Sequence, residues 1–337
     1  MSVRARREEL RKLMERLRLE ALLIRRPANF AWYTDGADNR VDHSDPLGVA
    51  GILLTPNAEY AFTDNIEAPR MREEQTARIE VVEYPWHEGP WNLLRELTGG
   101  GLIGTDFSTP ESLDVSADIA PLRYVLDADA IDRYRRLGAD AACAVSEVAD
   151  SLNPSDDELE VAATLAAACR RRGMFTPVLL AASGERMQRF RHSIPNGGPL
   201  GSRAMLVVCA ERGGLFANLT RIVEFYEPEP DTARSQRACE EILRRMREEA
   251  TRPGRTLCEA FEDGRRFYAE AGFPDGWRDH HQGGLTGYAS REIVATPDTS
   301  LGIKAGQVFA WNPSLSGAKA EETFVLTDAG PAVLTDQ

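Results

Sequence analysis

Three of the five histidines lie in polar segments rich in glycine and proline. His192 lies in "RFRHSIPNGGPLG", and the adjacent His280 and His281 lie in "DHHQGGLTGYASRE". Imidazole is the side chain that titrates near neutral pH without strong perturbation, so these residues are candidates for proton transfer. A single histidine in such a segment is more often an ordinary hydrogen-bonded residue. Three in similar surroundings favour a functional site, and the glycines indicate close approach of the backbone to another strand or a ligand.

A second polar pair lies near the C-terminus, in "FAWNPSLSGAKAEET" from Phe309 to Thr323. Asn312 lies where a strand-like pattern gives way to a turn, and Glu321 follows a glycine-containing hairpin. A carboxylate can form charge-assisted hydrogen bonds with a cationic group, and an amide can donate or accept. Both are therefore candidate site residues.

The bulk composition excludes several classes of partner. The chain has 337 residues and a formal net charge of −13, and such an acidic protein is poorly suited to bind phosphate backbones or anionic membranes. We expect a small-molecule substrate, with no nucleic acid and no membrane partner. Five cysteines without a C-x-x-C pair indicate a reducing compartment. No apolar stretch resembles a signal peptide or a membrane span, so the expected location is cytoplasmic.

Short strand-like runs alternate with helical stretches in the first third of the chain. An amphipathic helix is expected first, with Leu10, Leu13, Met14 and Leu17 at helical spacing. The strand-like runs lie at 21–24, 49–55, 59–63, 78–84 and 101–106. This alternation predicts a small α/β domain with a mixed sheet over residues 1–128.

The pattern changes after residue 128. Two long helices are expected first, and the second opens with Ser155 and Glu158 at capping-box spacing and ends at Gly173. The later patterns comprise strands at 176–181, 204–209 and 215–225, helices at 231–250 and 256–271, and a closing antiparallel pair of strands. We therefore expect a second domain over residues 129–337.

The order of these motifs resembles the pita-bread family of creatinase, prolidase and aminopeptidase P. The segments "RHSIPN", "LFANLTRIV", "HHQGGLTGY", "GQVFAWNP" and "GAKAEETFVLTDAG" follow one another in the order and at the spacing of that family. The resemblance covers essentially the whole chain and is strongest over residues 190–330. It implies an α+β fold, in which a pita-bread catalytic domain follows a smaller creatinase-type α/β domain, and it implies a homodimer.

The resemblance also implies a site for two metal ions, because metallopeptidases of that family hold two divalent cations with two Asp, one His and two Glu. His281 matches the His position and Glu321 matches the last Glu position. Asn218 stands at one Asp position and Asn312 at the other Glu position. Two of the four carboxylates are therefore replaced by amides.

The remaining Asp position has two candidate matches. Val207 fits if the spacing is ungapped, and Cys209 fits if the hairpin is two residues shorter. Neither is an acid, so one carboxylate of four remains. Because an unpaired buried charge costs several kcal/mol, this set cannot balance two dications. We therefore expect an enzyme without a bound metal or other cofactor.

Creatinase implies that this scaffold can hydrolyse a C–N bond without a metal, using a histidine at the position of His192. Our leading hypothesis is accordingly a metal-independent enzyme that performs hydrolysis, elimination or cyclisation on a small amino-acid-derived substrate. His192 would shuttle protons, His281 would orient substrate or water, and Glu321 would bind a cationic group of the substrate.

Six further residues are expected to contact the substrate: His280, Asn218, Asn312, Tyr288, Arg40 and Glu292. Tyr288 stands where family enzymes carry a second histidine, and Arg291 is a further candidate beside Glu292. Arg40 lies in a loop of the first domain that reaches the partner's site in creatinase-like dimers, where it would clamp a substrate carboxylate.

Two other functions remain open. The first is an unusual metallohydrolase, such as an Xaa-Pro dipeptidase or aminopeptidase, with one zinc ion on His281, Glu321 and Cys209. The second is a small-molecule-binding protein that uses the vacated pocket without catalysis.

Overall fold

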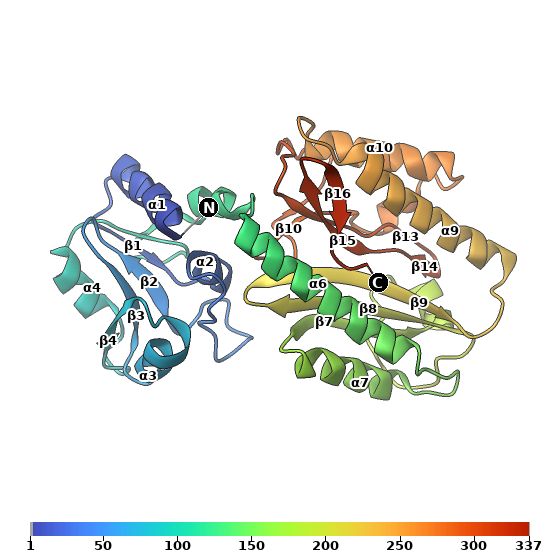
Figure 1. Cartoon of the computed structure of the whole chain (residues 1–337), viewed down its shortest axis with the longest axis horizontal. Helices are drawn as coiled ribbons and strands as arrows, with labels where there is room; N and C mark the ends of the chain where they lie inside the picture. The colour runs from blue at the N-terminus through green and yellow to red at the C-terminus, as the bar shows by residue number, and fades with distance from the viewer. Residues whose placement is uncertain (1–2, 337) are drawn as a thin grey trace. The chain divides into compact units, whose positions relative to one another are not determined.

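The chain divides into two compact units, Met1–Tyr124 and Val125–Gln337, in a computed structural model that describes residues 3–336 (Figure 1). The short segment ahead of the first long helix belongs to the second unit. Its Leu126 amide donates to the Gly306 carbonyl oxygen at 2.9 Å. Among residues 3–336, no helix combines the length and the apolarity needed to cross a bilayer.

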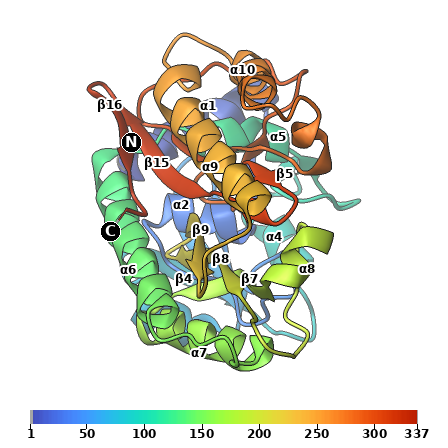
Figure 2. The same cartoon turned by 90° about the vertical axis from the view of Figure 1, so that its right-hand side faces the viewer.

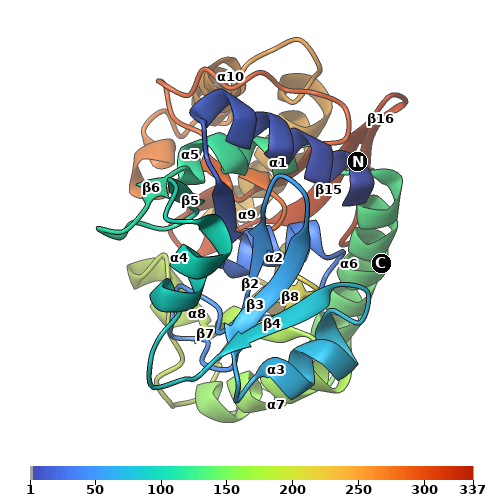
Figure 3. The ribbon, with the colours of Figure 1, turned by 90° about the vertical axis from the view of Figure 1, so that its left-hand side faces the viewer.

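A mixed six-stranded sheet forms the centre of the first unit, with the strand order β4-β3-β2-β1-β5-β6. The strands are β1 (Ala21–Ile24), β2 (Gly51–Leu54), β3 (Glu59–Asp64), β4 (Glu80–Tyr84), β5 (Ile103–Thr105) and β6 (Leu113–Asp114). Strand β1 pairs antiparallel with β2 and parallel with β5. Figure 3 faces this unit and shows β2, β3 and β4 side by side.

Helices of the first unit pack on this sheet through alternating strand residues. They are α1 (Val3–Leu17), α2 (Pro27–Tyr33), α3 (Ala68–Arg70), η1 (Met71–Gln75), α4 (Trp91–Thr98), α5 (Ser116–Ile119) and η2 (Ala120–Arg123). Leu23, Leu53 and Phe62 form one buried cluster with Leu94 of α4. Successive strand residues point to opposite faces, so residues such as Leu22 and Ile52 are buried on the other face.

Two antiparallel sheets build the second unit. The first has the order β7-β8-β9 and the second the order β11-β10-β12-β15-β16, with a small β13-β14 hairpin beside them. The strands are β7 (Phe175–Ser183), β8 (Arg203–Arg212), β9 (Leu215–Glu224), β10 (Gly283–Thr286), β11 (Ile293–Val294), β12 (Val308–Trp311), β13 (Ser314–Leu315), β14 (Ala318–Lys319), β15 (Glu322–Thr327) and β16 (Gly330–Val333).

The second unit contains two pairs of long helices, and Figure 2 shows both pairs. The helices are α6 (Ala128–Ala149), α7 (Glu158–Arg171), α8 (Gly184–Arg189), α9 (Pro230–Arg245), η3 (Met246–Ala250), α10 (Leu257–Glu270) and η4 (Gly276–Asp279). Helix α6 packs on β8 and β9 and α7 packs on β7, whereas α9 packs on the β13-β14 hairpin and on α10.

The start of α7 differs from the expected capping box. Asp157, not Ser155, is the N-cap, and its side chain accepts a hydrogen bond from the Leu159 amide. Glu158 is therefore the first helical residue and not the third. Its side chain is buried and accepts hydrogen bonds from residues on both sides of α8, Ser183 and Asn196. The carboxylate that the sequence pattern assigned to the capping box therefore makes tertiary hydrogen bonds instead.

Candidate active site

The two sheets of the second unit meet where β9 runs past the start of β15. The Thr220 amide donates to the Glu321 carbonyl oxygen at 3.1 Å. Two residues earlier on β9, the Asn218 amide donates to Thr323 Oγ1 at 2.8 Å, and that hydroxyl donates back to the Asn218 carbonyl oxygen at 2.9 Å. These hydrogen bonds hold the backbone at Asn218 of β9 next to the backbone that carries Glu321.

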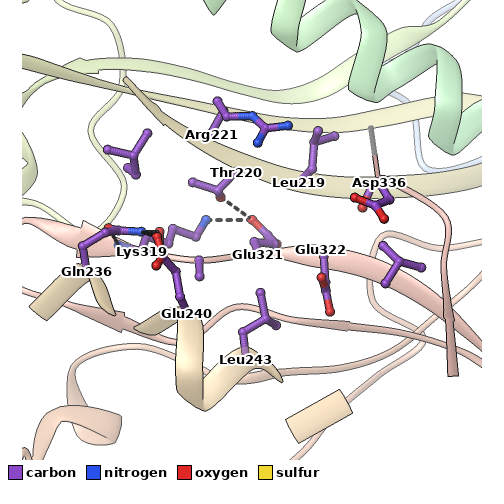
Figure 4. Close-up of a pocket in the computed structure, with 14 residues that line it drawn as sticks. Leu219, Thr220, Arg221, Gln236, Glu240, Leu243, Lys319, Glu321, Glu322 and Asp336 are labelled. Carbon is purple, nitrogen blue, oxygen red and sulfur yellow. Dashed lines mark hydrogen bonds and ion pairs between the residues drawn. The ribbon is translucent and has the colours of Figure 1, made fainter. Parts of the chain in front are cut away.

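Glu321 is buried between two cations. Its Oε2 lies 2.8 Å from Lys319 Nζ, and its Oε1 lies 2.9 Å from a terminal nitrogen of Arg291. The Thr220 hydroxyl donates to Oε2 at 3.0 Å, and Figure 4 shows Thr220 and Lys319 converging on this carboxylate. Burial alone would raise the pKa of Glu321, but Lys319 and Arg291 lower that pKa to about 2. The carboxylate is therefore ionised and already neutralised.

A pocket of about 260 Å³ borders this carboxylate and is lined by β9, by Lys319–Glu322 and by α9. On its α9 side, Gln236 accepts a hydrogen bond from the Lys319 amide at 3.3 Å and donates to the Lys319 carbonyl oxygen at 3.1 Å. The main chain of Lys319 is thus held on both sides of its side chain. Because residues i and i+2 of an extended chain share one face, Lys319 and Glu321 point the same way.

The two amides at the former carboxylate positions are buried. Asn218 is wholly inaccessible and Asn312, which follows β12, is 3% exposed. Among the described residues, no protein group donates to Oδ1 of either side chain. Each amide therefore presents an acceptor whose desolvation is already complete in the folded protein.

The register of the β8-β9 hairpin decides between the two matches for the missing aspartate. Gly213 and Gly214, both with positive φ, form a two-residue turn that places Cys209 directly opposite Asn218. Val207 instead packs in a hydrophobic cluster with Leu180 and Met205. Burial, and then the negative charge of Glu321, raise the pKa of the Cys209 thiol to about 12, so this thiol stays protonated.

The three histidines of the sequence motifs come together. Their possible ligand nitrogens all lie within 4.8 Å of one another. His280 Nε2 lies 3.0 Å from His192 Nε2, and the rings of His280 and His281 stack with centroids 4.3 Å apart. Burial lowers all three pKa values, that of His280 to about 3 and that of His281 to about 4, with nearby Lys319 and Arg291 adding to the effect. All three rings are therefore neutral at neutral pH.

Local structure positions His280 and His281. They link η4 to β10, and Gln282 donates to the His280 carbonyl oxygen at 2.6 Å. Gly283 has a φ of +99°, and a Cβ there would lie 2.1 Å from the Ala310 carbonyl oxygen, so β10 approaches β12 as only glycine permits. This explains the glycines that follow the histidine pair.

The loop that carries His192 is tied to the start of α7. Glu158, which is 1% exposed, accepts hydrogen bonds from the Ser183 amide at 2.7 Å and the Asn196 amide at 3.2 Å, and pairs with Arg186. Arg186 also donates to the Ile194 carbonyl oxygen at 2.7 Å. His192 itself is exposed on this braced loop.

Three other predicted residues have structural contacts outside this group. Tyr288 is buried, and its hydroxyl accepts a hydrogen bond from Arg133 of α6 at 2.9 Å. Glu292 accepts a hydrogen bond from the Tyr288 amide at 3.1 Å and so braces the loop after β10. Arg40 lies in the first unit, where Asp38 binds its guanidinium with two hydrogen bonds of 2.8 and 3.0 Å.

Lys319 and Thr220 were missed by the sequence analysis, which considered Arg291 only as a neighbour of Glu292. The alternation of an extended chain gives the signal for Lys319, since it precedes Glu321 by two residues. Thr220 follows Asn218 by two residues on β9 and offers the same signal. For Arg291, the sequence carries no comparable indication.

The residues at the expected positions do not fit two metal ions. Of the two-metal set, one carboxylate remains, and it is already bound by two cations. Within residues 3–336, His281, Glu321 and Cys209 do not form a group with ligand atoms close enough to hold an ion, so this alternative set does not fit one zinc ion either. The three histidines are different, because neutral imidazoles suit a transition-metal ion without deprotonation.

Comparisons with known proteins agree with this architecture. Residues 132–328 match the model of metallopeptidase family M24, and residues 6–149 match that of the creatinase/prolidase N-terminal domain. "Probable dipeptidase PepE" of Mycobacterium bovis is 25% identical over 310 residues, which cover 83% of this chain and 81% of that protein.

Solved structures show the same fold. The prolidase from Pyrococcus furiosus superposes with a TM-score of 0.81 at 19% identity, over 97% of this chain and 99% of that chain. Dipeptidase PepE from Mycobacterium ulcerans superposes with a TM-score of 0.78 at 19% identity, over 99% and 96%. The expected α+β pita-bread fold with a creatinase-type first domain is confirmed.

The expectation of a metal-independent hydrolase or lyase is wrong in the light of these matches. The matched family is one of metallopeptidases, and the relative that covers most of the chain carries the name of a dipeptidase. The charge count behind that expectation considered the former carboxylate positions alone. It left out a group of neutral nitrogen ligands that only the fold assembles.

Proposed function

Because the chain belongs to metallopeptidase family M24, we propose that it is a metal-dependent hydrolase of short peptides, with dipeptides that carry a free carboxylate as its substrates. The family match over residues 132–328 carries the proposal of peptide hydrolysis. The dipeptidase name of the curated relative supports the small size of the substrate.

The charges around Glu321 support the preference for a carboxylate. Lys319 and Arg291 contribute two positive charges and Glu321 one negative charge, which leaves a net charge of +1 beside neutral histidines. Lys319 and Arg291 therefore favour an anionic group, while Glu240, Glu322 and Asp336, which line the bordering pocket, favour an ammonium group. In a dipeptide, the terminal carboxylate is one residue from the scissile amide, so a cationic subsite here also orients that bond.

Glu321 then has a different role from the one expected from the sequence. Both of its oxygens are already hydrogen-bonded, so we assign to it the orientation of Lys319 and Arg291 rather than the binding of a cationic substrate group. A paired carboxylate that fixes two cations gives them the preorganisation that charge stabilisation requires.

His192 lies on a braced loop with its ring exposed, and we assign it to the site at which the peptide binds. Proton transfer by a histidine needs a ring nitrogen that binds no ion, so we do not assign that role to His192. A divalent metal ion, when bound, supplies polarisation of the scissile carbonyl and activation of water. Cytoplasmic location, a homodimer and the reach of Arg40 into a partner's site stay predictions.

A peptide panel tests this function. Purified protein is incubated with dipeptides, including Xaa-Pro dipeptides, and with the matching dipeptide amides, and free amino acids are quantified by chromatography. We expect cleavage of dipeptides, a KM for the amides at least ten-fold higher, and loss of activity after chelation that added Zn²⁺ or Co²⁺ restores.

The contrary results are equally clear. Equal cleavage of dipeptides and their amides would remove the carboxylate subsite but leave peptide hydrolysis intact. Absence of cleavage of every peptide with either Zn²⁺ or Co²⁺ would overturn the proposed function.

A further inference from the structure

We propose that His192, His280 and His281 bind one divalent transition-metal ion, such as zinc or cobalt, through three ring nitrogens. Within residues 3–336, they are the one group of His, Cys, Asp and Glu side chains whose ligand atoms are close enough to hold a metal ion. The catalytic role of this ion rests on the proposed hydrolase function. Binding itself is measurable without turnover.

The distances are close to those of a metal site. Zinc–nitrogen bonds of 2.0–2.1 Å in a tetrahedral arrangement separate the ligand nitrogens by about 3.3 Å. The Nε2 atoms of His192 and His280 are 3.0 Å apart, and no pair of ligand nitrogens in the group exceeds 4.8 Å. Small rotations of exposed side chains therefore suffice to complete the site.

Hydrogen bonding orients the central ligand. His280 Nδ1 lies 2.5 Å from the His281 carbonyl oxygen, which can only accept, so Nδ1 carries the proton of the neutral ring. Its Nε2 consequently presents a lone pair toward His192. A backbone carbonyl that accepts from the second nitrogen of a ligating histidine is the usual outer-shell arrangement at metal sites.

Two of the three ligands are held by rigid backbone. The Gln282 side chain donates to the backbone carbonyl oxygens of Trp277 at 3.1 Å and His280 at 2.6 Å. The backbone carbonyl oxygen of Gln282 accepts from the backbone amide of Asn312 at 3.0 Å. The third ligand, His192, lies on the loop that Glu158 and Arg186 brace. The site is thus largely formed before an ion arrives.

The donor set selects the class of ion. Imidazole suits zinc, cobalt, nickel and copper, whereas magnesium, calcium and manganese prefer oxygen ligands. Three neutral ligands leave at least one coordination position for water, as in catalytic zinc sites. Lys319 and Arg291 disfavour a cation nearby, but His192 and His281 are exposed to solvent that screens this repulsion. Ions that need several anionic ligands are therefore excluded from this site.

Titration calorimetry and cobalt absorption test the inference on tag-free, full-length protein. After removal of bound metal by chelation and dialysis, we expect one Zn²⁺ or Co²⁺ per chain and visible absorption typical of nitrogen-rich Co²⁺. The His280→Ala variant should bind at least 100-fold more weakly, in line with loss of a first ligand. His87→Ala, which removes an exposed histidine of the first unit, is the matched control and should bind like the wild type.

A second measurement on the wild type covers the case in which His280→Ala fails to fold. With ¹⁵N-labelled histidine, Zn²⁺ should shift the ring signals of three of the five histidines. Two equivalents of bound metal, a Glu321→Gln variant that loses the metal as fully as His280→Ala, or unchanged histidine signals would overturn the site. Metal binding at these histidines without any peptide cleavage would keep the site and remove the proposed function.

Discussion

Lys319 Nζ lies 2.8 Å from Glu321 Oε2, and the two side chains are only 6% and 2% exposed. This contact makes the surviving carboxylate part of an internal ion pair. It also places a fixed positive charge beside the three histidines, since Lys319 contributes to the lowered pKa values of all three.

Removal of Lys319 should strongly destabilise the second unit. In Lys319→Met, Glu321 keeps Arg291 and Thr220 but loses its nearest cation, and breaking a buried pair costs about 3–5 kcal/mol of the free energy of unfolding. Urea unfolding measures the loss. Lys12→Met, which breaks an exposed pair with Glu9, should change the free energy of unfolding far less. A double variant Lys319→Met/Glu321→Gln that is no more stable than Lys319→Met would contradict this account.

Acid should destabilise the protein in part through Glu321. Its pKa is about 2 in the folded protein against an ordinary value of 4.5, so unfolding is accompanied by proton uptake below pH 4.5. The stabilisation, about 3 kcal/mol, is complete above the unfolded pKa and is lost as the pH falls from 4.5 toward 2. Unfolding midpoints measured across this range should decline less steeply in Glu321→Gln. Parallel curves for the two proteins would show that Glu321 does not titrate as described.

Substitution of Gly283 should disturb the histidine pair. The new Cβ of Gly283→Ala would meet the Ala310 carbonyl oxygen at 2.1 Å, and the φ of +99° disfavours any L side chain. We expect a loss of more than about 2 kcal/mol of stability and at least a ten-fold loss of metal affinity. Gly302→Ala is the control, because nothing lies within 4 Å of its Cβ position. Thermal unfolding and calorimetry give both readouts, and wild-type values for Gly283→Ala would refute the close-approach argument.

Glu158 should control the order of the His192 loop. The Glu158→Ala variant removes the acceptor for two backbone amides and leaves Arg186 without its partner. We expect amides of residues 184–199 to exchange with solvent at least ten-fold faster, as seen by hydrogen exchange and mass spectrometry. Glu185→Ala provides the comparison, since the Glu185 side chain is 82% exposed and its ion pair with Arg189 is long at 3.8 Å. Equal exchange in the two variants would exclude a bracing role for Glu158.

The fold was predictable from the sequence because its signals are local. Strand-like runs and helical periodicity placed most elements, and the turn glycines and histidine motifs follow one another in a recognisable order. The replacement of carboxylates by Asn218 and Asn312 was also visible in the sequence, because each position lies within a recognisable family motif. The choice between Val207 and Cys209 could not, because it depends on a two-residue turn that sets the register of β8 against β9.

The contacts of the site were less predictable because they join distant segments. His192 and His280 are separated by 88 positions in the chain, and no periodicity relates them. Counting charges at the expected positions therefore did not show that the three histidines lie together or that Lys319 and Arg291 bind Glu321. Tyr288 shows the same limit, since its hydroxyl accepts a hydrogen bond from Arg133 of α6, 155 positions earlier in the chain.

The junction of β9 with β15 determines which parts of this protein can adjust to a ligand. The backbone hydrogen bond from Thr220 to Glu321 and the two bonds between Asn218 and Thr323 hold the two sheets together beside Glu321, so the sheets cannot separate there without breaking them. Adjustment on ligand binding consequently falls to side-chain rotation and to the connecting segments that carry His192 and His281. Specificity then changes by replacing residues on those segments, while the framework beneath them stays the same.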